Sequence, residues 1–323
     1  MAGAAKAPAT AAPAAALAAT DLIAVSFIEF FGIGSSAERA TQRMPDVLTS
    51  DHARAATAAG VVLGLQPHAP TTVDLDVYTW AAILSRSKHL PLSTHLAETP
   101  EERRFIEKGT GPQADFLQRM GVWDDTITSN VGKGRHPVAH LERFLRAIKS
   151  SGGAIAAHLN DATDEAIEIL AAAGTHVAYC PRASAYFAQH KSFGPHRYRD
   201  MLAQGVNVCL GTDSVINLPP SVADPSKQNS RISVLDDIRM LHRRDGTDPA
   251  TLIAMATING ARALRLREQA FTFTPGEPLA GVIALPTDPG TMADAGDPLV
   301  AALLSQEAPS LLLSCRNSGF TRR

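Results

Sequence analysis

The stretch LPLSTHLAET (residues 90–99) decides the fold, because an apolar run passes through a histidine and a carboxylate into the start of a helix. The run ends in His95, and Glu98 follows three residues later. Thr99 can cap a helix, a proline occupies the next position, and Glu102 stands third in the helix, which predicts a capping box. A strand that leads directly into a helix in this way is typical of an α/β protein.

Similar apolar runs recur along the chain and read as further strands, at 22–31, 61–66, 154–159, 176–181 and 206–211. They are short and continuously apolar rather than alternating, as expected for parallel strands that are covered on both faces. Helical patterns lie between them and beyond, near 72–87, 136–150, 195–204, 232–244 and 248–265. The alternation predicts a parallel sheet, either open or closed into a barrel, and the pattern alone does not choose between the two.

Three of the predicted strands end in side chains that can bind a metal or transfer a proton, namely His95, His158 and Asp213. Active sites of α/β barrels are built at the carboxyl ends of the strands. Glu98 lies in the loop that follows His95, where it can shuttle protons at a metal-bound water or simply favour the start of the next helix. The three strand ends together indicate a catalytic site.

Five short motifs in order along the chain resemble the metal-dependent amidohydrolases, in the branch that includes heterocycle deaminases and triazine chlorohydrolases. These motifs are PHAP (67–70), HLAET (95–99), AHLND (157–161), CPR (180–182) and LGTDS (210–214). The resemblance runs from about residue 22 to residue 285 and implies a (β/α)8 barrel of the TIM type. Residues 21–270 are expected to form this barrel, residues 271–323 a small C-terminal β appendage, and the Ala/Pro-rich residues 1–20 a disordered leader.

The resemblance also implies a role for each residue at the strand ends. His95 and Asp213 would bind one divalent ion, with Zn²⁺ favoured over Fe²⁺ as the alternative. Asp213 would accept a proton from the bound water, Glu98 would relay it to the leaving group, and His158 would orient the water or polarise the attacked atom. Such an ion lowers the pKa of bound water from 15.7 to about 7, which supplies hydroxide at neutral pH.

A small-molecule substrate would contact His68, Arg182 and Ser184, again by resemblance. His136 and His140 have a spacing that can bind metal, but the sequence has no HExxH motif, so a solvated helix face is predicted there. The expected reaction is the hydrolytic deamination of an aminated heterocycle or a nucleoside-like molecule. Two alternatives stay open, a hydrolytic dehalogenase with the same site and a non-catalytic truncated barrel.

The His-x-His pair that ends the first barrel strand of this family is absent from the sequence, since no two of the 11 histidines are separated by one residue. Two protein ligands then remain, where a catalytic zinc ordinarily has three and a water. The barrel is therefore expected to lack its first strand or strands. A truncated chain, a natural loss of metal catalysis and a partner that supplies the missing part are the explanations, and truncation is favoured.

Composition excludes some partners and indicates a compartment. A net charge of −2 and a pI of about 6.6 predict no nucleic-acid partner. No apolar stretch reaches the ~18 residues of a membrane span, so no membrane partner is expected. Cys180, Cys209 and Cys315 have no close spacing. Cys180 and Cys209 lie in apolar runs and are expected to be buried reduced thiols, which indicates a cytoplasmic protein. Assembly into a homo-oligomer is left open.

Overall fold

The computed structural model describes residues 14, 23–217, 233–277, 279–284, 297–304 and 310–314. The chain divides into two compact units. Unit 1 comprises Met1–Ala178 with His190–Asn207, and unit 2 comprises Tyr179–Gln189 with Val208–Arg323. Apart from residue 14, the predicted leader lies outside the described residues, and so does Cys315.

Unit 1 is built on strands that pair in parallel and in the order of the chain. The strands are β1 (Val25–Phe30), β2 (Val62–Pro67), β3 (Ser93–Leu96), β4 (Ile155–His158) and β5 (His176–Tyr179), which confirms the five strands predicted in this part of the chain. A bridge between Leu65 and Leu92 continues the pairing from β2 towards β3. Because each strand lies beside its predecessor, the carboxyl ends of all five meet at one edge.

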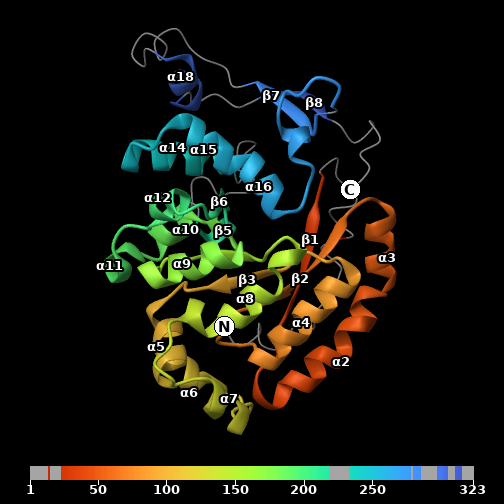
Figure 1. Ribbon diagram of the computed structural model, residues 1–323, viewed down its shortest axis with the longest axis vertical. Coiled ribbons are helices and arrows are strands. Elements are labelled where there is room, and N and C mark those ends of the chain that lie inside the picture. The colour runs from red at the N-terminus through yellow and green to blue at the C-terminus, as the bar shows by residue number, and fades with distance from the viewer. Residues whose placement is uncertain are drawn as a thin grey trace. The chain divides into compact units, whose positions relative to one another are not determined.

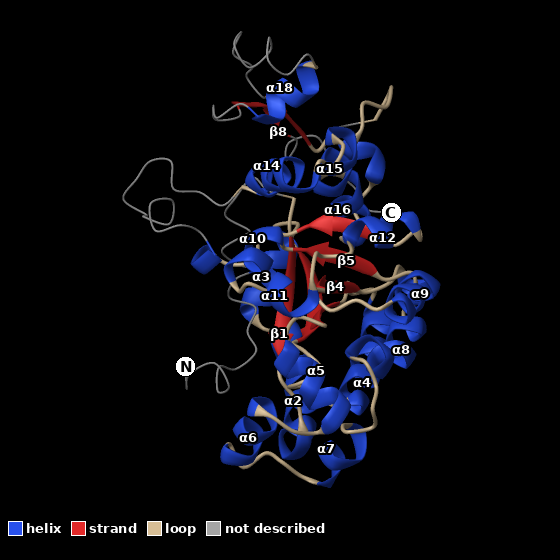
Figure 2. Cartoon of the chain, turned by 90° about the vertical axis from the view of Figure 1, so that its left-hand side faces the viewer, coloured by secondary structure: helices blue, strands red, loops and turns tan. Residues whose placement is uncertain are grey.

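Helices connect these strands and cover them (Figures 1 and 2). In unit 1 they are η2 (Gly34–Ser36), α2 (Ala37–Leu48), α3 (Asp51–Ala58), α4 (Leu75–Lys88), α5 (Pro100–Lys108), α6 (Pro112–Arg119), α7 (Asp125–Asn130), α8 (Pro137–Ala147), η3 (Lys149–Ser151), α9 (Asp164–Ala173), α11 (His190–Phe193) and α12 (Tyr198–Ala203). Helices α3 and α4 contact β2, and α8 packs between α4 and α9. The long connection between β3 and β4 holds α5 to α8.

Burial follows the prediction for the middle strands and differs for the first. In β3, β4 and β5 three of every four residues are buried, as expected for strands covered on both faces. In β1 buried residues alternate with accessible ones, and Glu29 is exposed. The prediction of continuous burial is therefore wrong for β1, which follows the pattern of a strand with one covered face.

The predicted capping box at the start of α5 forms only in part. Thr99 Oγ1 accepts a hydrogen bond of 3.1 Å from the Glu102 N–H, which confirms the cap. The Glu102 carboxylate does not reach back to Thr99. It accepts from the backbone N–H groups of Ala97 (2.8 Å) and Glu98 (2.7 Å), so the buried side chain fastens the loop after β3 to the helix.

The histidines at positions 136 and 140 do not lie on a solvated helix face, and that prediction is wrong. His136 is the N-cap of α8, where its Nδ1 accepts from the Val138 N–H at 3.1 Å. His136 and His140 are only 8% and 5% exposed. The helix turns this side toward the interior of unit 1, where Nε2 of His136 lies 3.5 Å from the Asp161 carboxylate.

Unit 2 consists mainly of helices. Its elements are α10 (Pro181–Tyr186), most of β6 (Asn207–Leu210), η4 (Val215–Asn217), α14 (Val234–Asp245), α15 (Pro249–Ala256), α16 (Ile258–Ala263), η5 (Glu268–Phe271), β7 (Gly281–Ala284), α18 (Pro298–Leu304) and β8 (Ser310–Ser314). In the segment predicted to form the C-terminal appendage, β7 pairs with β8 in antiparallel fashion. The two cysteines that the structure describes, Cys180 and Cys209, are buried thiols, as predicted.

Among the described residues, no helix combines the length and the apolar character that a membrane span requires.

Replacement of the cap residue tests how far α5 depends on it. Thr99→Ala should lower the free energy of unfolding by about 1 kcal/mol, because the Glu102 N–H loses its acceptor. Urea unfolding followed by circular dichroism measures the change. Thr126→Ala, at an exposed position in the first turn of α7, is the matched control. Equal losses in the two variants would contradict the assignment of the cap.

Burial of Glu102 predicts a dependence of stability on pH. Burial raises the pKa of this carboxyl from 4.5 to about 8, and the two backbone N–H donors offset only part of that effect. Between these two pH values the folded chain therefore holds a proton on Glu102 that the unfolded chain releases. The contribution of this proton to the free energy of unfolding is complete below about pH 4.5 and is lost as pH rises through 8. Urea unfolding between pH 5 and pH 9 should show stability falling relative to Glu102→Gln.

Glu101→Gln changes an exposed carboxyl in the same turn of α5 and serves as the control. Its pH profile should run parallel to that of the unmodified protein. If the free energy of unfolding of Glu102→Gln also changed with pH in the same way as that of the unmodified protein, Glu102 would be ionised in the folded chain, against the prediction.

Candidate active site at the strand ends

Three histidines lie side by side at the carboxyl ends of three neighbouring strands in unit 1. His68 follows β2 directly, His95 lies in β3, and His158 is the last residue of β4. The ring centroids of His68 and His95 are 4.9 Å apart, and those of His95 and His158 are 5.3 Å apart with the rings nearly parallel at 19°. The structure thus brings together three of the residues that the sequence singled out.

Backbone hydrogen bonds fix this row of histidines. The His68 N–H donates to the Phe30 carbonyl at the end of β1 (3.1 Å), and the His95 N–H donates to the His68 carbonyl (2.8 Å). Leu159, which follows His158, donates its N–H to the Leu96 carbonyl at 3.1 Å. The histidines are consequently held in register by the sheet itself rather than by their side chains.

The hydrogen-bond partners of His95 and His68 show which ring nitrogen of each carries the proton. His95 Nδ1 lies 3.0 Å from the His68 carbonyl, which can only accept, so Nδ1 carries the proton and Nε2 keeps its lone pair. His68 Nδ1 lies 2.7 Å from Thr72 Oγ1, and that hydroxyl donates to the Ala69 carbonyl at 3.2 Å. The Thr72 hydroxyl is therefore the acceptor, and His68 also presents a lone pair at Nε2.

Burial keeps His68 neutral. Desolvation, together with the nearby charges that His95 and His158 would carry, lowers the pKa of His68 from 6.5 to about 4. The imidazole is consequently an uncharged base at neutral pH, the state in which histidine binds metal ions.

Two carboxylates border the row of histidines. Glu98 Oε1 lies 3.7 Å from His158 Nε2, and the Glu98 carbonyl accepts from Asn160 Nδ2 at 3.1 Å. On the other side, one ligand atom each from Glu29, His68 and His95 lie within 4.8 Å of one another. The sequence analysis did not single out Glu29, although it is the one charged residue in the apolar run 22–31.

Left-handed backbone conformations recur where these strands end. Ala97 (φ 53°), His158 (φ 75°) and Leu159 (φ 53°) adopt them in unit 1, and Asp213 (φ 56°) adopts one in unit 2. Such conformations are unfavourable for residues other than glycine and persist where surrounding contacts hold them, often at functional sites. The strain therefore coincides with two of the predicted catalytic residues, His158 and Asp213.

Asp213 follows β6 in unit 2, where its Oδ2 accepts from Asn217 Nδ2 at 3.1 Å. This bond orients the carboxylate at the strand end. The carboxylate keeps oxygen lone pairs that can still accept a proton or bind an ion.

Arg182 and Ser184, both predicted to contact substrate, lie on α10 in unit 2. The Arg182 guanidinium makes two bonds to the buried Asp237 carboxylate, from Nε at 3.0 Å and from Nη2 at 2.8 Å. Burial raises the pKa of Asp237, and the opposing charge of Arg182 offsets part of that effect. The observed role of Arg182 is to tie α10 to α14, and substrate contact by Arg182 and Ser184 stays a prediction.

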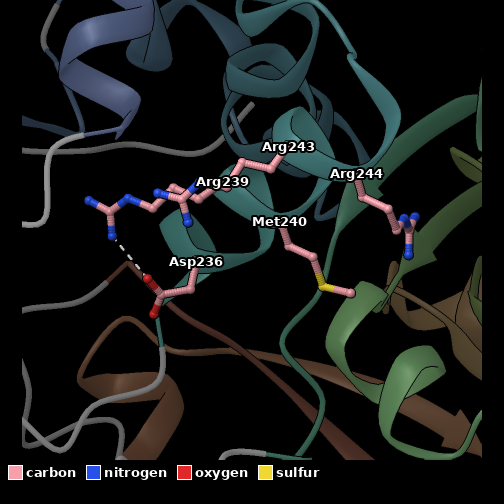
Figure 3. Close-up of a pocket in the computed structure, with 5 residues that line it drawn as sticks. All are labelled: Asp236, Arg239, Met240, Arg243 and Arg244. Carbon is pink, nitrogen blue, oxygen red and sulfur yellow. Dashed lines mark hydrogen bonds and ion pairs between the residues drawn. The ribbon is translucent and has the colours of Figure 1, made fainter. Parts of the chain in front are cut away.

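A surface pocket on α14 is lined by Asp236, Arg239, Met240, Arg243 and Arg244 (Figure 3). Arg239 Nη1 bonds Asp236 at 2.9 Å, and Arg244 Nε bonds Asp245 at 2.7 Å. The pocket is lined by none of the residues that the sequence analysis selected, and two of its lining arginines, Arg239 and Arg244, are engaged with acidic neighbours.

Comparison with known proteins identifies similar chains. The aminodeoxyfutalosine deaminase of Deinococcus radiodurans is 29% identical over 212 residues, which cover 64% of this chain and 46% of that protein. The 5-methylthioadenosine/S-adenosylhomocysteine deaminase of Pyrococcus horikoshii is 28% identical over 212 residues, covering 63% and 40%. The chain thus spans less than half the length of these two relatives.

The fold is also found among solved structures. The E. coli guanine deaminase superposes with a TM-score of 0.59 at 15% sequence identity, over 90% of this chain and 61% of that one. The parallel strands and their covering helices are thus part of a (β/α)8 barrel, as the sequence motifs implied. Residues 3–283 match the Amidohydrolase family, and the chain belongs to that family.

Proposed function

We propose that this chain is a metal-dependent hydrolase that cleaves a C–N bond, deaminating an aminated heterocycle or a nucleoside-like small molecule. The observation that carries the proposal is the grouping of His95, Glu98 and His158, with the His158 ring stacked on His95 and its Nε2 3.7 Å from Glu98. A metal ligand, a proton carrier and a second acid/base group are what hydrolytic deamination requires. The two relatives described above, both named as deaminases, support this choice over dehalogenation.

The donor set of the site fits a divalent ion. His68 and His95 each present an imidazole Nε2, and Glu29 adds a carboxylate, the N and O donors that zinc prefers. We propose Zn²⁺, with His95 as one of its ligands, and we propose the Asp213 carboxylate as a proton acceptor. When bound, the ion supplies a water of pKa about 7.

Proton transfer falls to the side chains around that position. The Glu98 carboxylate relays a proton of the attacking water to the amino group, which leaves as ammonia while oxygen takes its place on the ring. Its loop is fastened by the hydrogen bonds that the backbone N–H groups of Ala97 and Glu98 donate to Glu102, so the backbone that carries Glu98 is held in place. His158, beside Glu98, orients the water or polarises the attacked atom.

Several assignments extend this proposal. The barrel is proposed to comprise residues 21–270 and the appendage residues 271–323. Substrate contacts are proposed for Arg182 and Ser184. A cytoplasmic location agrees with the buried thiols Cys180 and Cys209.

Ammonia release tests the proposal. The zinc-supplemented chain, incubated with adenosine, 5′-methylthioadenosine and guanine, should release ammonia from at least one of them. Glu98→Gln should lower kcat about 10²- to 10⁴-fold, because the amide cannot carry the proton. Glu101→Gln, an exposed carboxyl three residues away, should keep full turnover.

Full turnover in Glu98→Gln would remove Glu98 from the mechanism. Absence of ammonia release from a panel of aminated heterocycles, with zinc bound to the chain, would contradict the proposed function as a whole.

A further inference from the structure

We propose that Glu29, His68 and His95 form the binding site of a single divalent transition-metal ion, complete within unit 1. The family resemblance gave His95 a metal role and His68 a substrate role, and it gave Glu29 none. The structure places one ligand atom of each residue within 4.8 Å of the others. The inference deepens the proposed function by naming ligands, but metal binding at this site does not depend on any catalytic activity.

The sheet supplies one ligand from each of three neighbouring strands. Glu29 in β1 is in register with Gln66 in β2, and His68 follows two residues later. His95 in β3 is joined to His68 by the backbone bond of 2.8 Å. Parallel pairing therefore positions all three side chains at the carboxyl edge before any ion is present.

Each ligand has a hydrogen-bond partner that aims it. The Thr72 hydroxyl accepts from His68 Nδ1, and the His68 carbonyl accepts from His95 Nδ1, which leaves the Nε2 lone pair of both rings for an ion. Gln66 Nε2 donates to Glu29 Oε1 at 3.1 Å, so the other carboxylate oxygen can turn to the ion. Metal-bound histidines and carboxylates are ordinarily held by such outer partners.

The donor types select the class of ion. Two imidazoles and one carboxylate suit Zn²⁺, Fe²⁺ or Co²⁺, whereas Mg²⁺ and Ca²⁺ prefer sets made of oxygen alone. Zinc bonds of about 2.0–2.1 Å place ligands roughly 3.3 Å apart, so the side chains must draw together on binding. The exposed Glu29 has the freedom to do so.

Three protein ligands with an open position are also the ordinary set for catalytic zinc. Glu29, His68 and His95 make such a set of three. The ligand role of His68 takes the place of the substrate contact predicted for it.

Titration with Co²⁺ tests the site directly. The 323-residue chain is stripped with a chelator, titrated with Co²⁺ under visible absorption, and then challenged with Zn²⁺. One equivalent should bind and be displaced by Zn²⁺. Glu29→Gln and His68→Ala should each weaken binding by more than about 100-fold, and Thr72→Val by about 10- to 100-fold, because it removes only an outer partner.

Matched controls separate ligation from surface charge. Glu38→Gln and His52→Ala change exposed residues of unit 1 and should bind Co²⁺ as the unmodified chain does. Circular dichroism should show each variant folded, and Glu29→Gln is the decisive variant because its side chain is exposed.

Undiminished Co²⁺ affinity in Glu29→Gln would overturn the inference, and so would the absence of binding in the unmodified chain. The two proposals fail separately. A chain that binds Co²⁺ through Glu29 but releases no ammonia loses only the proposed function. A chain that releases ammonia and binds metal equally well without Glu29 loses only this site.

Discussion

The backbone of His68 joins three strands, and the site depends on that junction. Its N–H donates to Phe30 at the end of β1, and its carbonyl accepts both the backbone N–H and the ring Nδ1–H of His95. One residue thereby sets the register of β1, β2 and β3 at their carboxyl ends and the tautomer of a neighbouring ring. Side chains that could bind an ion or move a proton are consequently positioned by the same bonds that hold the sheet together.

The loop after β3 depends on a second constraint, the buried carboxyl of Glu102. Its oxygens accept hydrogen bonds from the backbone N–H groups of Ala97 and Glu98. Ala97 has a left-handed conformation, which alanine does not favour. A buried polar group with two partners holds such a loop more firmly than water contacts would. Glu98 is fixed relative to His158 for this reason, and precise placement of a proton carrier is what catalysis requires.

Much of this arrangement could be predicted from the sequence, because local patterns determine it. Continuous apolar runs identified the strands of unit 1, and the polar residue that ends a run identified His95 and His158. The patterns could not show which distant groups meet. The Glu102 carboxyl bonds the backbone of Ala97 and Glu98 instead of completing the capping box with Thr99. The His136 side chain is buried rather than exposed. Glu29 becomes a candidate ligand only because its register with β2 brings it near His68.

The central claim is that the carboxyl ends of β1, β2 and β3 hold the metal ion of this amidohydrolase chain. An anomalous difference map from zinc-loaded crystals of the 323-residue chain, recorded at the zinc absorption edge, tests it most directly. The account predicts one strong peak, about 2.0–2.2 Å from His68 Nε2, His95 Nε2 and a Glu29 oxygen. A peak bound elsewhere, or none at this position in a chain that contains zinc, would contradict it.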